Sequence, residues 1–204
     1  MGDPTTSTTR GGYAKGEARR EHIVEIATEI FGTQGFRAAT MLQIAAACDI
    51  SRTGLLHHFP TKESLLEAVL AHRDADSPTD PPTDDDPRTR LRRILAVVER
   101  NATQPQIVNL FAVLSAEAGD PSHPAHHYFA QRYDRLRADL QQACRSLAAA
   151  GQLVPEADPQ ALAIEIIALM DGLQVQWVLA PDDIDMVAIL RHRLNAALTV
   201  PIDN

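Results

Sequence analysis

Apolar residues recur at intervals of three and four along most of the chain, and no stretch alternates regularly between apolar and polar positions. The clearest case lies between residues 16 and 33, where the apolar positions are Ile23, Ile26, Ala27, Ile30 and Phe31. This spacing places them in one stripe on a helix, with charged residues on the opposite side. The pattern therefore predicts an all-α protein.

Capping residues divide the region that follows into short helices. Gly35 supplies a stop for the first helix. Helix N-termini are then marked by Thr40, Ser51 and Thr61, whose side chains can accept hydrogen bonds from the first backbone amides. Pro60 ends the helix that Ser51 begins, because the residue before a proline avoids the helical conformation. The resulting helices span residues 41–47, 51–58 and 61–73.

Residues 74–88 differ from the rest of the chain. They contain four prolines and six aspartates, and otherwise no apolar residue larger than alanine. Such a segment cannot form a core, and it is predicted to be a mobile acidic, proline-rich loop. Beyond it the helical pattern resumes, and the predicted helices span residues 86–101, 104–119, 122–151, 158–180 and 184–198.

Charge and composition narrow the class of protein. The net charge of −8 argues at first against a nucleic-acid partner, but the acidic excess lies mostly beyond residue 73 and four basic residues stand between Arg10 and Arg20. Two cysteines make no disulfide framework, and the N-terminus does not resemble a secretory signal. The most apolar run, residues 161–179, is interrupted by Glu165 and Asp171, which argues against a membrane span. We expect a cytoplasmic protein.

The helices of residues 41–47 and 51–58 have the spacing of a helix-turn-helix pair. Ala45 is small enough for a steep helix crossing, and Asp49 can adopt the left-handed conformation that the turn requires. Near the start of the second helix, where a recognition helix meets base edges, the outward-facing residues are Arg52, Thr53, Leu56 and His57. From spacing alone, DNA binding and a simple packed hairpin are equally good interpretations.

One segment of the chain resembles the N-terminal domain of the TetR family of transcriptional regulators, over about residues 17–72 without a gap. The motifs that carry the resemblance are F-G-T-Q-G-F, I-A-A-A and H-H-F-P-T-K-E-S-L-L. Further along, D-G-L-Q-V-Q-W resembles the regulatory domain of actinobacterial-type members. Two positions depart from the family pattern: Asp49 stands where glycine is usual, and Leu56 where tyrosine is usual.

The resemblance implies a DNA-binding surface. Thr40 and Lys62, at two helix starts, would hold backbone phosphates, and Gly54 would allow close approach of the recognition helix. Leu56 lacks the hydroxyl of the usual tyrosine, and His58 would touch phosphate or pack beside Phe59. The implied DNA-contact residues are Thr40, Arg52, Thr53, Gly54, Leu56, His57, His58 and Lys62.

The expected architecture is all-α with about nine helices. Residues 1–16 form a flexible basic arm, and residues 17–73 form a three-helix helix-turn-helix DNA-binding domain with a connecting helix. Residues 74–88 are the mobile loop, and residues 89–204 form a larger domain for ligand binding and dimerisation. The function expected of this architecture is repression of transcription.

The helix of residues 159–180 is apolar around so much of its circumference that it must be covered on more than one side. A homodimer through the last two helices, packed as a four-helix bundle, explains the excess, while an internal helix of a monomer is the alternative. The resemblance implies the same dimer. It would bind a palindromic operator, with recognition helices about 34–36 Å apart.

The resemblance also implies a small-molecule effector that binds in the C-terminal domain, shifts the helix of residues 61–73 and releases the operator. Aromatic or polar residues on otherwise apolar helical surfaces are candidates for the binding site. They are Phe111, Leu114, Tyr128, Tyr133, Asp171, Gln174 and Trp177. Such a lining suits a hydrophobic or aromatic compound.

Three histidines leave an enzymatic alternative open. His123, His126 and His127 could hold a metal ion, but no carboxylate or cysteine stands nearby at ligand spacing and H-E-x-x-H is absent. Solvated or hydrogen-bonded histidines are the favoured interpretation, so no metal, no cofactor and no catalytic site is predicted. The alternatives are a regulator without a small-molecule effector, and a helical metal-dependent enzyme that uses these histidines.

Overall fold

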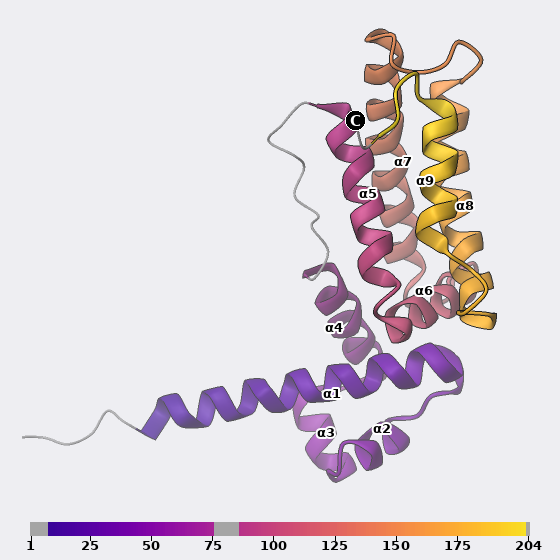
Figure 1. Ribbon diagram of the computed structural model, residues 1–204. Helices are drawn as coiled ribbons and strands as arrows, with labels where there is room; N and C mark the ends of the chain where they lie inside the picture. The colour runs from indigo at the N-terminus through magenta and orange to yellow at the C-terminus, as the bar shows by residue number, and fades with distance from the viewer. Residues whose placement is uncertain (1–7, 76–85, 203–204) are drawn as a thin grey trace, which may run out of the picture.

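The computed structural model describes residues 8–75 and 86–202, and within these ranges the chain forms nine α-helices and no strand. The first four helices in the chain make a lower layer, from which the fourth rises toward the rest of the molecule, and the other five make an upper bundle (Figure 1). The lower four are α1 (Thr8–Ala38), α2 (Met41–Ala47), α3 (Arg52–His58) and α4 (Lys62–Ala75). The upper five are α5 (Pro87–Asn101), α6 (Pro105–Glu117), α7 (His126–Ala149), α8 (Pro159–Leu179) and α9 (Met186–Ala197). The all-α prediction is confirmed.

The predicted caps form in the structure. The hydroxyl of Thr40 accepts a hydrogen bond from the Gln43 backbone amide, and the Gln43 side chain accepts one from the Thr40 amide, which completes a capping box. Ser51 accepts from the Gly54 amide at 3.0 Å. At the start of α4, Thr61 accepts from the amide of Ser64 at 3.0 Å. Local hydrogen bonding therefore sets where these short helices begin.

Two predicted boundaries are corrected. Helix α1 begins at Thr8, so residues 8–16 of the expected arm are helical, while residues 1–7 lie outside the described residues. The expected loop of residues 74–88 is helical at both ends, because α4 extends to Ala75 and Asp86 caps α5 through the Arg88 amide at 3.0 Å. Its central residues, 76–85, lie outside the described residues.

Helix α7 starts at His126, four residues later than expected. Side chains in the preceding segment bond to nearby backbone groups and stabilise turns in place of a helix. Asp120 accepts hydrogen bonds from the backbone amide and hydroxyl of Ser122, at 2.9 and 2.8 Å. The Nδ1 atom of His123 accepts one from the Ala125 amide at 3.2 Å.

Two hydrophobic cores hold the molecule together. The first joins α1–α4 to α6 and the start of α7, and its fully buried members include Phe31, Leu55 and Leu110. The second joins α5, the rest of α7, α8 and α9 around Leu140, Ile166 and other buried residues. Figure 1 shows why α6 belongs to the first core: it crosses beneath the upper bundle, next to the C-terminal half of α1.

Candidate nucleic-acid interface

The turn between α2 and α3 has the predicted geometry. Asp49 adopts φ 52°, the left-handed conformation that the spacing requires. The turn is closed by a hydrogen bond from the Ile50 amide to the Ala45 carbonyl, at 3.0 Å. Ala45 is buried, as a steep crossing of two short helices demands. The two helices therefore form a helix-turn-helix pair.

Helix α3 is fixed to the lower layer by its apolar face. Leu55 and Phe59 are almost fully buried, at 0% and 1% exposure. Arg20 of α1 lies over the ring of Phe59, with its guanidinium carbon 4.1 Å from the ring centroid, and donates to the His58 carbonyl at 2.9 Å. The opposite face of α3 is thus held outward in a defined orientation.

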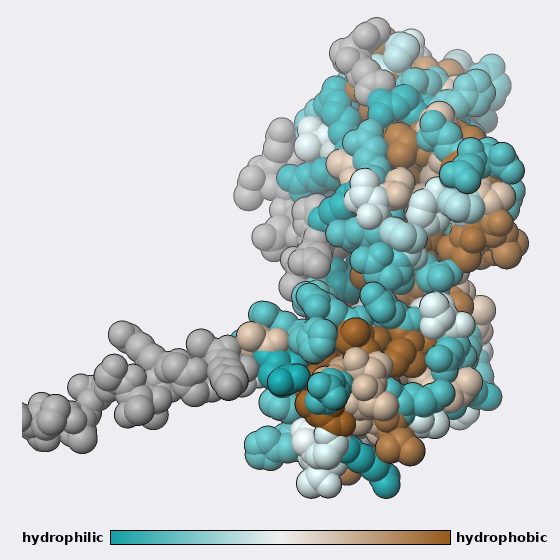
Figure 2. Space-filling model, turned by 60° about the horizontal axis from the view of Figure 1, so that its bottom comes forward, coloured by the Kyte–Doolittle hydropathy of each residue, from teal (hydrophilic) through white to brown (hydrophobic). Residues whose placement is uncertain are grey.

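The predicted contact residues of α3 lie on this outer face. Arg52, Thr53 and His57 are exposed, whereas Gly54, Leu56 and His58 are partly buried. The rings of His57 and His58 meet edge to face, with centroids 5.8 Å apart. Figure 2 shows the lower end of the molecule, where the helix-turn-helix pair presents mixed polar and apolar groups. The DNA contacts themselves stay predictions.

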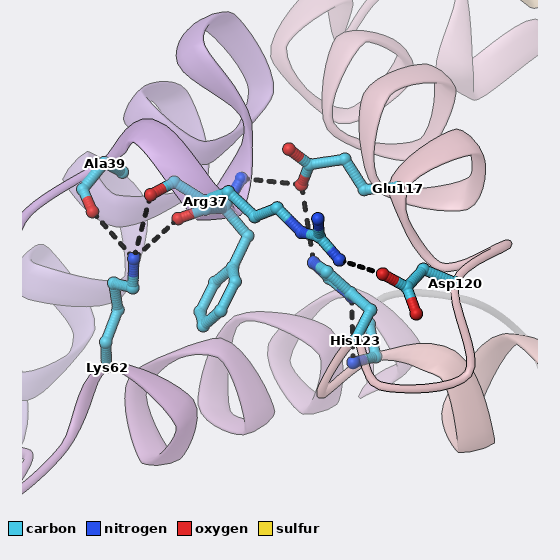
Figure 3. Close-up of polar contacts among 8 residues, drawn as sticks. Arg37, Ala39, Lys62, Glu117, Asp120 and His123 are labelled. Atoms are coloured by element: carbon cyan, nitrogen blue, oxygen red, sulfur yellow. Dashed lines mark hydrogen bonds and ion pairs between the residues drawn. The ribbon is translucent and has the colours of Figure 1, made fainter.

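Lys62 has contacts within the protein that the sequence did not indicate. Its ammonium group donates to the carbonyl oxygens of Phe36, Ala39 and Arg37, at 2.8, 2.9 and 3.4 Å (Figure 3). It also lies 4.4 Å from the centroid of the Phe36 ring. A lysine ammonium has three N–H groups, so these carbonyls engage all of them. Lys62 caps the C-terminus of α1, where a positive charge also interacts favourably with the helix dipole, and its phosphate contact stays a prediction.

Thr40 is exposed at the N-terminus of α2, but its hydroxyl is engaged in the capping box with Gln43. An exposed residue that the sequence reasoning missed stands beside it: Leu42 is 65% exposed on the same short helix. Helical spacing places Met41, Ile44 and Ala45 on the face that packs against the core, and Leu42 lies off that face.

Glu117, at the C-terminus of α6, has a structural role that the sequence did not indicate. Its Oε2 atom accepts a hydrogen bond from the Phe36 backbone amide at 2.8 Å, across 81 residues of sequence. Asp120, three residues on, forms an ion pair with Arg37. The pKa of Asp120 is lowered to about 2, first by the Ser122 amide and hydroxyl and then by Arg37. These contacts join the end of α1 to the turn that follows α6.

The predicted effector residues separate into two groups. Tyr133 and Asp171 come together between α7 and α8, where the phenol donates to the carboxylate at 2.8 Å. Burial raises the pKa of the Asp171 carboxyl, and burial together with the Asp171 charge raises the pKa of the Tyr133 phenol. Phe111 and Tyr128 lie beside this pair through Phe129, whose ring centroid is 5.5, 5.2 and 6.4 Å from those of Phe111, Tyr128 and Tyr133.

The remaining effector residues lie elsewhere. Leu114 is fully buried in the first core. Gln174 lines a shallow hollow with the buried Asn101 and with apolar residues of α5, α8 and α9. Trp177 is half-buried against the second core. The structure thus brings together Tyr133, Asp171 and the aromatic rings, but not the whole predicted set.

The three histidines of the enzymatic alternative have separate partners. His123 accepts from the Ala125 amide, the Nδ1 of His126 bonds to the Ala118 carbonyl at 2.8 Å, and the Nε2 of His127 bonds to Gln131 at 2.7 Å. Among residues 8–75 and 86–202, no three histidine, cysteine or acidic side chains gather in a metal-binding group. The enzymatic alternative therefore gains no support.

Comparison with known proteins gives a consistent result for both halves of the chain. Residues 23–69 match the family model described as "Bacterial regulatory proteins, tetR family", and residues 87–199 match that of "BetI-type transcriptional repressor, C-terminal". The transcriptional regulator BetI of Burkholderia lata is 29% identical over 182 residues, which cover 86% of this chain and 90% of that protein. The expected actinobacterial-type subgroup stays a prediction.

Solved structures share the fold. A transcriptional regulator from Saccharomonospora viridis in complex with choline superposes with a TM-score of 0.68 at 20% identity, covering 87% of this chain and 94% of that one. The SmeT–triclosan complex gives a TM-score of 0.70 at 18% identity, covering 91% and 94%. The helix-turn-helix layer beneath a helical bundle is therefore a known arrangement.

Proposed function

Because the chain belongs to the TetR family of transcriptional regulators, we propose that it is a homodimeric repressor that reads a palindromic operator with α3 and is released by a small molecule. The observation that carries the DNA-binding part is the helix-turn-helix pair. Leu55 and Phe59 fix one face of α3 to the core, while Arg52, Thr53 and His57 stand exposed on the other. As a DNA-binding protein it would act in the cytoplasm.

Replacement of Arg52 by alanine tests the assignment of α3. Arginine at the start of a recognition helix can bind guanine in the major groove, and loss of such a contact costs about 1–3 kcal/mol, or roughly 5- to 150-fold in affinity. We expect Arg52→Ala to weaken operator binding by at least about tenfold, measured by fluorescence anisotropy. Arg145→Ala, which removes the same charge from an exposed site on α7, should change binding by less than about twofold. Equal losses in both variants would count against α3 as the reading helix.

Dimerisation is supported by an uncovered apolar stripe on α8. Ile164, Val175 and Leu179 are 52%, 50% and 81% exposed, and the small residues Ala168 and Gly172 lie between them on the same face. A Cβ atom added at Gly172 would meet no atom within 4 Å, so nothing within the chain covers the middle of the stripe. Figure 2 shows apolar surface on the side of the upper bundle where α8 ends. By length and composition alone α8 could also span a membrane, but its other face packs into the second core.

The effector would bind beside the Tyr133–Asp171 pair. This pair is a polar anchor next to aromatic rings, an arrangement that suits a hydrophobic or aromatic compound with one polar group. The solved relatives that bind choline and triclosan support the general idea that such a bundle takes small molecules.

A compound screen that follows the fluorescence of Trp177, the single tryptophan, tests this site. For a compound that binds, Tyr133→Phe should weaken affinity by about tenfold or more, because removal of the phenol leaves a buried polar group without its partner. His127→Ala, at an exposed position on α7, is the control and should change affinity by less than about twofold. Unchanged affinity in Tyr133→Phe would place the site elsewhere. A protein that binds its operator but none of the compounds would favour the regulator without an effector.

A further inference from the structure

The DNA-binding helices are joined most closely to α6, a helix that the sequence places in the regulatory domain. Among the described helices, the most extensive contact is that between α1 and α6. Their backbones approach so closely at Gly32 that an added Cβ atom would lie 3.1 Å from the Leu110 nitrogen. Helices that pack backbone to backbone in this way have little freedom to slide, so α1 and α6 form a rigid pair.

Side-chain contacts also connect α6 to α4. Phe111 of α6 belongs to the first core, and the guanidinium carbon of Arg73, near the end of α4, lies 4.5 Å from its ring centroid. Arg73 is 6% exposed, so this contact is shielded from water. Helices α5, α8 and α9 and the rest of α7 pack around the second core, in which α6 has no buried member, whereas the start of α7 belongs to the first core with α6. The boundary between the two cores therefore runs through α7, with α6 and the start of α7 on the side of the DNA-binding helices.

Glu117 fastens the end of α6 to the end of α1. Its carboxylate accepts the Phe36 amide at 2.8 Å, and this amide follows directly on Gly35, where φ is 79° and the helix breaks (Figure 3). A Cβ atom at residue 35 would clash with the same carboxylate. Gly35 thus permits both the backbone turn and the close approach of Glu117.

His123 supports Glu117 from the other side. Its side chain is fully buried, and its Nε2 atom lies 3.4 Å from Glu117 Oε2. Because Nδ1 accepts a hydrogen bond from the Ala125 amide, the neutral ring carries its proton on Nε2, directed at the carboxylate. Burial, the largest cause, lowers the pKa of His123 below its ordinary 6.5, and Glu117 opposes that shift. The ring also packs edge to face on Phe36, with centroids 5.2 Å apart.

The segment held by Glu117 carries the helix-turn-helix pair. The carbonyls of Phe36, Arg37 and Ala39 all accept hydrogen bonds from Lys62, the first residue of α4, and Thr40 is the N-cap of α2. A shift of Glu117 would therefore move the start of α2 and α4 together, and α3 with them.

We propose that Glu117 is the positioning residue through which α6 fixes the end of α1, and with it the placement of the two recognition helices in the dimer. This inference rests on the proposed dimeric repressor. Tyr133 of α7 packs against both cores, at the boundary between them. An effector that binds beside Tyr133 and Asp171 would then act at the boundary between the two cores.

The experiment compares operators that differ in the spacing of their half-sites. A palindromic operator is first selected from random DNA with the wild-type protein, and then lengthened or shortened by one and two base pairs at its centre. The wild-type protein should prefer one spacing by about tenfold or more, within the usual range of coupling between sites. Glu117→Ala should reduce this preference to less than about threefold, with affinity for a single half-site unchanged within about twofold.

Two further variants make the result specific. Glu117→Gln keeps an oxygen that can accept the Phe36 amide but removes the charge that faces His123, so it should reduce the preference by about twofold and no further. Glu156→Ala removes an exposed carboxylate after α7 and should leave the preference at the wild-type value. If Glu117→Ala fails to fold, Glu117→Gln decides, and a preference equal to that of the wild-type protein overturns the inference.

Other outcomes are equally decisive. The inference is overturned if Glu117→Ala keeps the wild-type preference, or if it loses half-site affinity along with spacing preference, because the residue would then only stabilise the fold. Failure of the wild-type protein to select any palindrome contradicts the proposed function instead. The two failures are therefore distinguishable.

Discussion

Substitution of Gly35 by alanine should lower the free energy of unfolding by about 2.5–6 kcal/mol. The backbone at Gly35, with φ 79° and ψ 161°, lies in a region that is essentially restricted to glycine, and occupying it with another residue costs about 1–3 kcal/mol. The new Cβ atom would also displace the Glu117 carboxylate and break its hydrogen bond with the Phe36 amide. Loss of a hydrogen bond to a charged group adds about 1.5–3 kcal/mol. Urea denaturation followed by circular dichroism measures the sum.

Gly151→Ala is the matched control. Gly151 also has a positive φ, of 68°, but an added Cβ atom would meet nothing within 4 Å. The free energy of unfolding then falls only by the cost of the left-handed backbone, about 1–2 kcal/mol. If the two substitutions destabilised the protein equally, the contact between Glu117 and the end of α1 would contribute nothing to stability.

Substitution of Leu179 by glutamate should convert the dimer to a monomer. Leu179 is 81% exposed at the end of the uncovered stripe of α8, so the folded chain tolerates the charge. In a two-fold interface the substitution occurs twice, and each carboxylate would be buried without a partner. We expect the dissociation constant of the dimer to rise by about 100-fold or more, equivalent to about 2.8 kcal/mol. Sedimentation equilibrium would report a fall in mass toward that of one 22.3 kDa chain.

Val200→Glu provides the comparison for Leu179→Glu. Val200 is another exposed apolar residue, 46% exposed, and it lies beyond α9 rather than on the stripe of α8. The variant should remain dimeric and should bind the operator as the wild-type protein does. If the Leu179→Glu variant sedimented with the same mass as the wild-type dimer, α8 would not form the dimer interface.

The short helices were predictable because their signals are local. Thr40, Ser51 and Asp86 each bond to an amide two or three residues ahead, so the residue types alone mark the helix starts. The left-handed Asp49 was predictable for the same reason, since a fixed number of residues must connect two helices at a steep angle. The α7 boundary was not predicted, because Asp120 and His123 stabilise turns that compete with the helix.

Roles that depend on distant segments could not be read from the sequence. Lys62 stands at a helix start, which suggested a phosphate contact, but the fold brings the C-terminus of α1 to it and its charge caps that helix. Glu117 looks like an ordinary acidic residue at a helix end, and only the packing of α6 on α1 gives it the Phe36 amide as a partner. The assignment of α6 to the first core likewise follows from three-dimensional contact, not from its place after the acidic segment.

This assignment changes how release from DNA would occur. The family resemblance implied that the effector shifts the helix of residues 61–73. In the structure, that helix contacts the regulatory domain through the guanidinium group of Arg73, which lies over the ring of Phe111. Helix α6 is in turn fixed to α1 by the close approach at Gly32 and by the hydrogen bond of Glu117. A signal that moves α6 would therefore reach α2 and α3 through α1 as well as through α4.

The most direct test of whether the protein is a sequence-specific regulator has two steps. DNA is selected from a random pool, and the selected site is then titrated with the protein at several salt concentrations. We predict a palindrome with half-sites about one helical turn apart, two chains bound per site, and an affinity that falls linearly with salt concentration on logarithmic axes. Enrichment of no sequence, or equal binding to selected and random DNA at physiological salt, would contradict this function.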